Sequence, residues 1–345
     1  MKKKSTHATL SEVARKAGVG TTTVSRVING GDRVSAKTLA RVLEVIETLG
    51  YSPNQAARTL KGHRTKTIGL IIPSMADPFF ASCAEAAHTV AREHDSLLIV
   101  TTTHNDAKME IENVNLLIRH RADGLLIVPA NSHGLALRDL LNRTITPVVA
   151  IDRPVYNSSI ASVVADNFQG AMIATQHLVD HGYKRIACLT GESTLYTIGE
   201  RINGYRETNQ AAGLPCILDI SVKDYMSAEL AIRKLLAGPD PPEAIFTLKN
   251  STTIYAFEAL QKLNVPVPGV VALLGYDDFE LASTVRPSIS VIQQPAEEIG
   301  TLATELLFKQ LLDGAPVPVQ ARNKTVQQMR LKTRLIIRSS CGCQP

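Results

Sequence analysis

The sequence predicts an all-α helix-turn-helix headpiece followed by an α/β body of two doubly wound lobes. Apolar residues follow helical spacing in residues 10–49, whereas short apolar strands alternate with helices from Lys66 onward. The charge divides near the same point. Residues 1–66 contain 13 Lys and Arg against 4 Asp and Glu, and the remainder contains 24 against 28. Taken alone, such a basic head is either a solvated terminus or a domain that binds a polyanion.

The first predicted helix begins at a capping box and presents one apolar face. Thr9 and Glu12 have the spacing of reciprocal cap residues, and Gly18 breaks the helix. The apolar face consists of Leu10, Val13, Ala14 and Ala17. A second short helix is expected from Thr21 to about Asn29. Its apolar residues are Val24, Val27 and Ile28.

A third helix is expected between Ser35, which can cap its N-terminus, and Gly50, which follows its C-terminus. Its apolar face consists of Leu39, Val42, Leu43, Ile46 and Leu49. Two short helices joined by a Gly-containing turn and braced by a third form a helix-turn-helix, although a purely structural three-helix bundle has the same pattern. In a helix-turn-helix, the N-terminal residues of the second helix lead into the major groove of DNA.

DNA contacts are therefore expected from the polar side chains of the second helix. The candidates there are Thr21, Thr22, Thr23, Ser25, Arg26 and Asn29. Hydroxyl groups can hydrogen-bond phosphates or base edges, and Arg26 can pair bidentately with a guanine. The segment from Asn54 to Leu60 is about two helical turns, too short to be stable alone. We expect it to fold against DNA or a second copy of the chain.

The body reads as alternating strands and helices. The expected strands are residues 68–73, 97–100, 124–129, 148–152, 186–190, 244–248 and 270–276. Short, continuously apolar strands that alternate with helices predict parallel sheets covered on both faces. The length of this region exceeds one sheet, so we expect two lobes.

Ligands of such folds bind beyond the carboxyl ends of strands or in the cleft between lobes. The polar and aromatic residues expected there are Phe79, Phe80, Asp152, Arg153, Arg201, Lys249, Asn250 and Asp277, with Asp77 and Asp278 beside them. This mixture suits a polyhydroxylated ligand, because each hydroxyl group both donates and accepts hydrogen bonds. Any one of these residues taken singly is as well explained by a loop salt bridge or a helix cap.

Several other classes of protein are disfavoured. The sequence has no Gly-x-Gly-x-x-Gly after a strand, no Walker loop, no Gly-x-Ser-x-Gly elbow and no His-rich metal spacing, so we expect neither an enzyme nor a cofactor. Five scattered cysteines do not form a disulfide framework. Cys341 and Cys343 would need two further ligands nearby to hold zinc, and the adjacent sequence has none. The nine His residues are expected at surface or structural positions, and no metal is expected.

The expected location is the cytoplasm. No apolar run reaches the roughly 18 residues of a membrane span, and no apolar segment typical of a secretory signal follows the basic N-terminus. A transport solute-binding protein, the other class that uses a two-lobed body, would need such a signal and would not need the basic head.

The headpiece closely resembles that of the LacI/GalR family of bacterial repressors. The stretches that carry the resemblance are residues 8–14, 17–19, 23–29, 34–35 and 49–54. The resemblance implies that residues 1–53 are the DNA-binding domain and 54–65 a hinge helix and linker. It implies that Leu60 enters the minor groove, with Ala57 beside it, where an apolar wedge kinks the duplex. Tyr51 and Asn54 join the predicted DNA-binding set. Gly20 stands where the family usually has Ser.

The body resembles the same family, and the whole resemblance covers roughly residues 8–338. The matching stretches are residues 77–80, 122–126, 151–154, 201–205, 274–278 and 293–295. The implied fold of residues 66–345 is that of periplasmic binding proteins, with crossings between lobes near residues 165, 293 and 323. The N-lobe would then comprise about 66–165 and 294–323, and the C-lobe about 166–293 and 324–340. In the family, the positions of Phe80, Asp152, Arg201 and Asp277 touch the small effector.

One departure from the family pattern concerns the effector. The family usually has Asn-Asp where this chain has Lys249-Asn250, so the local charge changes by +2. With Arg153 and Arg201 nearby, the pocket is expected to prefer an acidic sugar or a sugar phosphate. Alternatively, Lys249 points outward or pairs with Asp277 and leaves a neutral-sugar site, and a nucleobase effector also remains open.

The resemblance implies a repressor of carbohydrate-utilisation genes whose operator affinity depends on the effector. Closure of the lobes would alter the spacing of paired hinge helices in a dimer, which couples the two sites. A twofold dimer reads a pseudo-palindromic operator. No Leu heptads follow Arg338, so a homodimer rather than a coiled-coil tetramer is expected.

Overall fold

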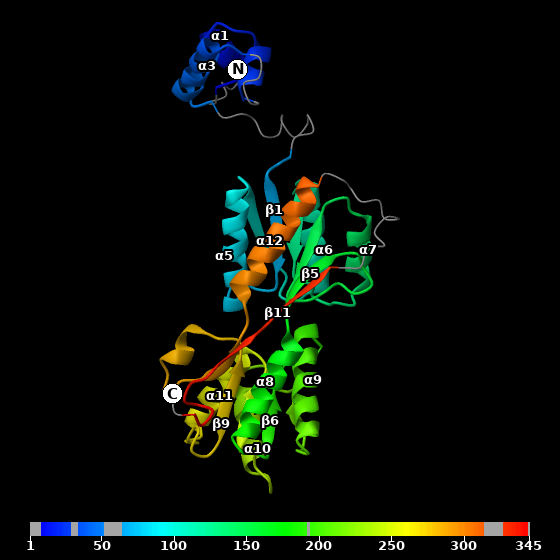
Figure 1. Cartoon of the computed structure of the whole chain (residues 1–345), viewed down its shortest axis with the longest axis vertical. Coiled ribbons are helices and arrows are strands. Elements are labelled where there is room, and N and C mark those ends of the chain that lie inside the picture. Colours follow the sequence, from blue (N-terminus) through cyan, green and yellow to red (C-terminus); the bar gives the residue numbers. More distant parts are fainter. Residues whose placement is uncertain (1–7, 29–33, 52–63, 192–193, 314–326, 344–345) are drawn as a thin grey trace, which may run out of the picture. The chain divides into compact units, whose positions relative to one another are not determined.

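The computed structural model describes residues 8–28, 34–51, 64–191, 194–313 and 327–343. The chain divides into two compact units, Met1–Thr65 and Lys66–Pro345. Figure 1 shows the small helical unit and the larger unit of two α/β lobes.

The first unit contains the helices α1 (Leu10–Ala17), α2 (Thr21–Ile28) and α3 (Ala36–Leu49). The predicted caps are confirmed: Thr9 and Glu12 form the capping box of α1, and Ser35 accepts a hydrogen bond from the Thr38 amide at the start of α3. Gly18 and Gly50 end their helices in the left-handed conformation, at φ 60° and 56°, which glycine adopts without steric cost. The buried core consists of Val13, Ala14, Ala17, Val24, Val27 and Val42.

The first lobe of the second unit is built on a six-stranded, wholly parallel sheet. In spatial order its strands are β11 (Gln328–Leu331), β5 (Ala161–Ala165), β4 (Val148–Ile151), β3 (Gly124–Ile127), β1 (Thr67–Ile72) and β2 (Leu97–Thr102). Its helices are α5 (Pro78–Glu93), α6 (Ala107–Arg119), α7 (Leu135–Arg143) and α12 (Ala296–Leu312).

The second lobe is built on another six-stranded sheet, in which only β12 runs antiparallel to its neighbour. In spatial order its strands are β12 (Arg334–Ile336), β10 (Ser290–Gln293), β9 (Ala272–Tyr276), β8 (Ala244–Thr247), β6 (Ile186–Leu189) and β7 (Ile217–Asp219). Its helices are α8 (Asn167–Asp180), α9 (Tyr196–Ala211), α10 (Tyr225–Leu236) and α11 (Asn250–Lys262), with a short 3-10 turn at Glu280–Ser283.

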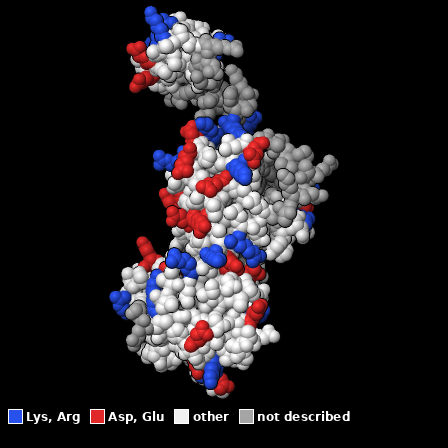
Figure 2. Space-filling model, viewed as in Figure 1, with Lys and Arg blue, Asp and Glu red and all other residues white. Residues whose placement is uncertain are grey.

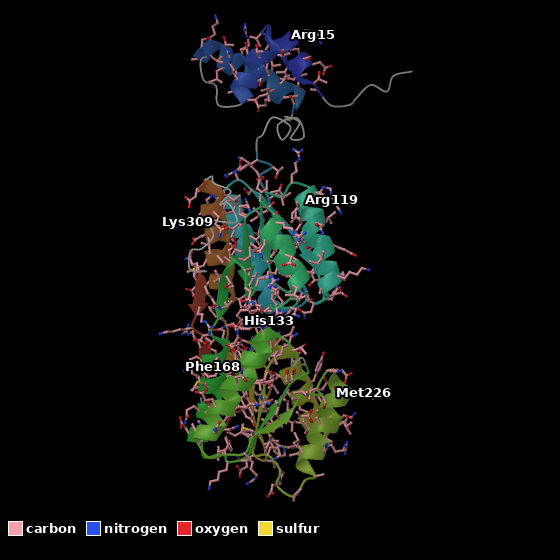
Figure 3. The ribbon with its side chains drawn as sticks, turned by 90° about the vertical axis from the view of Figure 1, so that its right-hand side faces the viewer. Arg15, Arg119, His133, Phe168, Met226 and Lys309 are labelled. Carbon is pink, nitrogen blue, oxygen red and sulfur yellow. The ribbon has the colours of Figure 1, made fainter. Side chains whose placement is uncertain are left out.

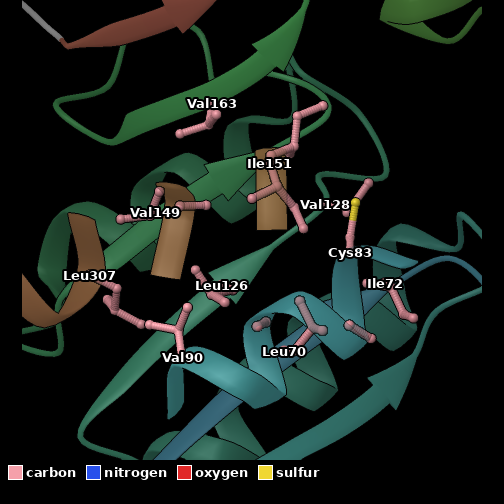
Figure 4. Close-up of a cluster of buried hydrophobic side chains, with 14 of the residues drawn as sticks. Leu70, Ile72, Cys83, Val90, Leu126, Val128, Val149, Ile151, Val163 and Leu307 are labelled. Carbon is pink, nitrogen blue, oxygen red and sulfur yellow. The ribbon is translucent and has the colours of Figure 1, made fainter. Parts of the chain in front are cut away.

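The central strands of both sheets are buried along their whole length, which explains their continuous apolar runs. In the first lobe, side chains of β1, β3 and β4 pack against α5 and α12, as Figure 4 shows for Leu70, Leu126, Val149 and Leu307. The packing is tight: a Cβ added at Gly124 would lie 2.9 Å from a methyl group of Leu307. The two sheets therefore form rigid platforms for the loops at their carboxyl ends.

The chain passes between the lobes after Ala165, after Gln293, and between Leu331 and Arg334. The expectation of a third crossing near residue 323 is wrong. β11 pairs with β5 from Gln328 to Leu331 and so still belongs to the first lobe. This edge strand alternates exposed and half-buried residues, so it lacks the continuous apolar run by which the central strands were found.

Candidate functional site

A pocket lies between the two lobes, at the carboxyl ends of the strands. From the first lobe it is lined by Pro73, Ser74, Asp77, Phe79, Phe80, His104, Asn105, Asp152 and Arg153. From the second lobe and the second crossing it is lined by Leu195, Thr197, Ile198, Arg201, Lys249, Asp277 and Gln294. Figure 2 shows basic and acidic side chains next to each other where the lobes meet. The charged groups of the pocket therefore come from both lobes.

The strands explain how these side chains reach the pocket. Asp152 directly follows β4, Asp277 directly follows β9, and Lys249 lies two residues beyond β8. Asp152 and Asp277 have φ values of 66° and 69°, a left-handed conformation that is uncommon for non-glycine residues but more accessible to Asp than to most others. Each turn redirects the chain at the end of a buried strand.

Asp152 and Arg153 form a buried ion pair on the first-lobe side. The Nε of Arg153 donates to a carboxylate oxygen of Asp152 at 3.0 Å, and both side chains are about 95% buried. A second guanidinium nitrogen donates to Asn105 Oδ1 at 2.9 Å and to the Pro129 carbonyl at 3.0 Å. Burial raises the pKa of Asp152, and the attraction of Arg153 and Arg201 opposes that rise. Arg153 is thus fixed from several sides.

Arg201 and Asp277 form a matching pair on the second-lobe side. Nη1 of Arg201 donates to Asp277 Oδ2 at 3.2 Å and to the Leu248 carbonyl at 2.6 Å. Nε of Arg201 donates to Asn167 Oδ1 at 2.8 Å, and the guanidinium lies 3.7 Å from the centre of the Tyr276 ring. The pair therefore presents a fixed, charged wall, with most of the hydrogen-bonding capacity of Arg201 already used.

Gln294 extends this wall at the second crossing. Its amide nitrogen donates to Asp277 Oδ1 at 2.5 Å. Its amide oxygen is buried and accepts no hydrogen bond from the described part of the chain. A buried acceptor of this kind gains a partner when a ligand brings a donor to it.

Asp77, Lys249 and Asn250 lie where the two lobes approach each other. Asp77 caps α5 by accepting a hydrogen bond from the Phe79 amide at 3.1 Å, and Asn250 donates to the same carboxylate at 3.4 Å across the cleft. Burial and the nearby Asp277 raise the pKa of Asp77, whereas Lys249 opposes the rise. Lys249 precedes the first turn of α11 and lines the pocket.

An aromatic contact and a weak ion pair also connect the lobes. The ring of Tyr156, stacked on His133 at 4.6 Å, meets the ring of Tyr196 from the second lobe edge-on at 5.9 Å. His133 lies at the junction of the lobes in Figure 3. Arg330 of β11 lies 3.9 Å from the carboxylate of Glu200 on α9. These contacts join the two lobes outside the lining of the pocket.

The structure brings seven of the eight predicted effector residues to this pocket. Asn250 is the exception, since it bridges the lobes through Asp77 and is not among the lining residues. Sequence reasoning did not select His104, Asn105 or Gln294. His104 and Asn105 follow β2 with φ values of 51° and 58°, so the strand-end rule applied to β2 would have found them. Gln294 follows β10, a strand that was not predicted.

The headpiece presents the predicted face of α2. Thr21, Thr22 and Arg26 are exposed and Thr23 and Ser25 are half-buried, while the two valines of the helix face the core. Tyr51 is half-buried against that core. Asn29, Asn54, Ala57 and Leu60 lie outside the described residues, as does most of the predicted hinge segment 54–65.

One expectation about metal ligands is revised by the structure. Cys341 and Cys343 have no ligand-type neighbours in the adjacent sequence, but the fold places His177 and His181 beside them. This cluster lies in the second lobe, on α8 and the C-terminal segment, and shares no residue with the interlobe pocket.

Two family models together match almost the whole chain. Residues 65–337 match the periplasmic binding proteins and sugar binding domain of the LacI family, and residues 9–54 match the bacterial regulatory proteins of the lacI family. The ribose operon repressor of Escherichia coli (strain K12) is 33% identical over 334 residues, which are 96% of this chain and 98% of the relative. The HTH-type transcriptional repressor PurR of Aliivibrio salmonicida (strain LFI1238) is 31% identical over 309 residues, covering 89% and 93%.

Solved structures show the same fold. The transcriptional regulator CelR in complex with cellobiose is 30% identical, with a TM-score of 0.68 over 97% of this chain and 100% of that one. The lac repressor dimer bound to operator and the anti-inducer ONPF is 22% identical, with a TM-score of 0.83 over 97% and 99%; that likeness is one of fold. No helix among the described residues is long and apolar enough to cross a bilayer.

The helix-turn-helix headpiece and the two-lobed body together define a DNA-binding transcriptional regulator rather than an enzyme. The matches extend over both units of the chain. The chain belongs to the lacI family of bacterial regulatory proteins.

Proposed function

We propose that this chain is a cytoplasmic repressor of carbohydrate-utilisation genes that binds a pseudo-palindromic operator as a homodimer and is controlled by a sugar-class effector. The observation that carries the proposal is the polar pocket between the lobes, in a chain that also has a DNA-reading headpiece. Relatives are named ribose operon repressor and CelR in complex with cellobiose, which supports both the gene class and the ligand class.

The pocket suits a ligand with many hydroxyl groups. Carboxylates of Asp77, Asp152 and Asp277 accept hydrogen bonds, and Asn105 and the amide oxygen of Gln294 add neutral polar groups. Phe79 and Phe80, with ring centres 5.1 Å apart and nearly perpendicular, form an aromatic wall against which the apolar face of a sugar ring can pack.

Within the sugar class, we propose a sugar acid or a sugar phosphate. Lys249 stands where the family usually has a neutral Asn and lines the pocket, so it is the residue that distinguishes this pocket from one with a neutral amide. Lys249 stands at the N-terminus of α11, where backbone amides favour an anion.

A neutral sugar is the second candidate, and one observation favours it. The lining contains three carboxylates, from Asp77, Asp152 and Asp277, and three Lys and Arg side chains. Such a balanced pocket does not require a charged ligand. A nucleobase, suggested by the relatives named PurR, would use the aromatic wall but offers fewer hydroxyl groups to the polar lining than a sugar does.

The deciding experiment is calorimetry of the full-length protein with an aldonate, the matching neutral sugar, its phosphate ester and a purine base. We expect the acid or the phosphate to bind at least about tenfold tighter than the neutral sugar, a difference of about 1.4 kcal/mol. In Lys249→Asn that preference should disappear, whereas Lys234→Asn on α10, outside the pocket lining, should retain it. Equal affinities for acid and neutral sugar in the wild type would overturn the anion proposal and leave the sugar-class proposal standing. Binding of the purine alone would overturn both.

The DNA-binding proposal has its own test. Selection from random duplexes should enrich a twofold-symmetric site, and Arg26→Ala should lose about tenfold to hundredfold in affinity for that site while non-specific binding changes little. Lys37→Ala, in the first turn of α3 rather than in α2, is the matched control for the loss of one positive charge. An asymmetric enriched site, or an Arg26→Ala protein with unchanged specificity, would contradict the proposal. Leu60→Ser tests the proposed hinge in the same assay, with an expected loss of specific binding only.

The proposed coupling between the two sites depends on lobe closure. An effector that draws the walls of the pocket together would shift the first lobes of a dimer and so change operator affinity. Disrupting the contact between Tyr156 and Tyr196 with Tyr196→Ala should alter the effector concentration needed for the DNA response more than it alters effector-free DNA affinity. An unchanged response curve would exclude this contact from the coupling.

A further inference from the structure

A cluster of two histidines and two cysteines lies in the second lobe. His177 and His181 are separated by one helical turn at the end of α8, so they share a face. Cys341 and Cys343 flank Gly342 in the segment after β12. The Nε2 atom of His177 lies 3.3 Å from the sulfur of Cys341 and 3.7 Å from that of Cys343, and Nε2 of His181 lies 3.0 Å from the sulfur of Cys343.

The fold holds the cysteine segment against α8 by several contacts. Ser340 donates its hydroxyl to the Leu273 carbonyl at 2.6 Å and accepts from the Ser290 amide at 2.9 Å, which anchors the segment to β9 and β10. The Tyr183 hydroxyl donates to the Cys341 carbonyl at 3.2 Å. Because of these contacts, the cysteines meet α8 as part of a packed structure.

Gly342 allows both sulfurs to reach the histidines. Its φ of 100° lies in the region that favours glycine, and a Cβ there would lie 2.6 Å from the Tyr183 hydroxyl oxygen. Any other residue at this position would be strained and would collide with the tyrosine. The turn between the two cysteines is therefore specified by the residue that separates them.

The separations fit a shared metal ion. With zinc–sulfur and zinc–nitrogen bonds of the usual lengths and tetrahedral angles, a sulfur and a nitrogen on one ion are about 3.6 Å apart. The three measured separations are 3.0, 3.3 and 3.7 Å. The donor atoms of His177, His181 and Cys343 all lie within 4.8 Å of one another. Cys341 lies next to His177 but outside that group, so its side chain would have to move to join the other three donors around one ion.

The surrounding hydrogen bonds orient the donors as a metal site requires. Nδ1 of His181 donates to the His177 carbonyl at 2.7 Å, which leaves the lone pair of its Nε2 directed at Cys343. Carbonyl partners of this kind fix the tautomer of metal-binding histidines. The Ser290 hydroxyl donates to the sulfur of Cys341 at 3.1 Å, which helps to hold this side chain beside His177.

We propose that His177, His181, Cys341 and Cys343 form a structural zinc site that ties the C-terminal segment to α8. Two thiolates and two imidazoles are a donor set that zinc prefers, in the closed four-ligand arrangement of structural sites. Cys341 is fully buried and Cys343 half-buried, whereas His181 is exposed, so an ion can enter from the solvent side. The site is independent of the interlobe pocket, and its test is independent of the proposed effector.

The test is metal analysis of the full-length protein purified under reducing conditions, followed by titration of the metal-stripped protein with Zn²⁺ and Co²⁺. We expect about one zinc ion per chain, and a cobalt form with the intense visible bands of tetrahedral coordination and thiolate charge-transfer absorption. Cys343→Ser and His181→Gln, both at accessible positions, should lower zinc affinity by about 100-fold or more. Cys216→Ser, an exposed cysteine elsewhere in the second lobe, should bind zinc like the wild type.

A stability measurement complements the metal analysis. Zinc should raise the thermal midpoint of the stripped wild type and of Cys216→Ser, because a ligand that binds the folded state stabilises it. It should leave the midpoints of Cys343→Ser and His181→Gln unchanged. Zinc content and affinity that are the same in all four proteins would overturn the proposal. So would a native protein in which mass spectrometry finds Cys341 and Cys343 joined as a disulfide and no metal bound.

Discussion

The headpiece and the interlobe pocket differ in how far apart in the sequence their hydrogen-bonded polar residues lie. In the headpiece, Thr9 bonds to Glu12 and Ser35 to Thr38, each three residues apart. In the pocket, Arg201 bonds to Asn167, to the Leu248 carbonyl and to Asp277, which are 34, 47 and 76 residues away. The headpiece can therefore acquire its polar contacts helix by helix, whereas the pocket acquires them only when the sheets are complete.

The two regions also differ in burial. The capping groups of the headpiece are exposed, and water can replace any contact that is lost. The charges of the pocket are almost fully enclosed, with side-chain exposures of 4% for Arg201 and 11% for Asp277. Removal of one partner there leaves a charge without compensation, which is costly in a medium of low polarity. The contrast predicts large mutational effects in the pocket and small ones in the headpiece.

The largest effect is expected for Arg201→Ala. The substitution leaves Asp277 without its cationic partner. It also removes the hydrogen bonds to Asn167 and to the Leu248 carbonyl and the cation over Tyr276. We expect the free energy of unfolding of the body to fall by about 3–5 kcal/mol, measured by urea unfolding of the full chain. Arg201→Lys keeps the positive charge but loses the planar guanidinium group. Its free energy of unfolding should lie between those of Arg201→Ala and the wild type.

Arg330→Ala is the matched control for that experiment. Arg330 lies 3.9 Å from Glu200, and its side chain is 46% exposed, so the pair contributes at most about 0.5 kcal/mol. If Arg201→Ala proves as mild as Arg330→Ala, the pocket is not organised by its buried pairs and the comparison with the headpiece fails.

A buried carboxyl group outside the pocket gives the next largest effect. Glu110 on α6 is 1% exposed and accepts a hydrogen bond from the Ala130 amide at 2.7 Å. Burial raises its pKa to about 7, against opposing effects of the Ala130 hydrogen bond and Arg153. Because the folded state holds this proton more tightly than the unfolded state, stability should fall as pH rises from about 4.5 to about 7. Glu110→Gln should remove that loss.

The measurement is the unfolding free energy across this pH range for wild type, Glu110→Gln and Glu112→Gln. The difference between Glu110→Gln and wild type should reach about 2–3 kcal/mol above pH 7 and shrink toward acid pH. Glu112 is exposed on the same helix and stays in contact with solvent in both states, so its substitution should leave the curve unchanged. Parallel curves for all three proteins would show that Glu110 does not ionise against a burial penalty.

This difference in the sequence separation of interacting residues also explains which features could be predicted from the sequence and which could not. The three headpiece helices and their caps were predicted correctly because each signal lies within four residues of the element that it ends or begins. The strands β1, β4, β8 and β9 were recognisable from continuous apolar runs, and the residues that follow them reach the pocket. Strand ends therefore predict the lining where the strand itself is central and buried.

The failures have physical causes of the same kind. β5, β7 and β10 were not predicted, although β5 and β10 are as long as central strands that were; each contains only two large apolar residues. Gln294 was missed with β10. The third crossing was predicted too early in the chain because the edge strand β11 is half-exposed and lacks a continuous apolar run. The His and Cys cluster was missed because its members are up to 166 residues apart. The pairing of β12 with β10 and the hydrogen bonds of Ser340 and Tyr183 bring the C-terminal segment to α8. Contacts created by tertiary folding have no local signal.

The smallest effect is expected for the loss of the Thr9 cap in Thr9→Ala. The side chain of Thr9 accepts a hydrogen bond from the Glu12 amide, and the Thr9 amide donates one to the Glu12 carboxylate at 2.8 Å. Loss of such a cap costs about 1 kcal/mol, and the cost should be confined to the headpiece because the two units are separately compact. Native-state hydrogen exchange should show faster exchange for amides of α1 to α3 and unchanged exchange for those of β3. Ser11→Ala, at an exposed position inside α1, is the control and should change neither set. Faster exchange in β3 would mean that the headpiece and the body unfold together.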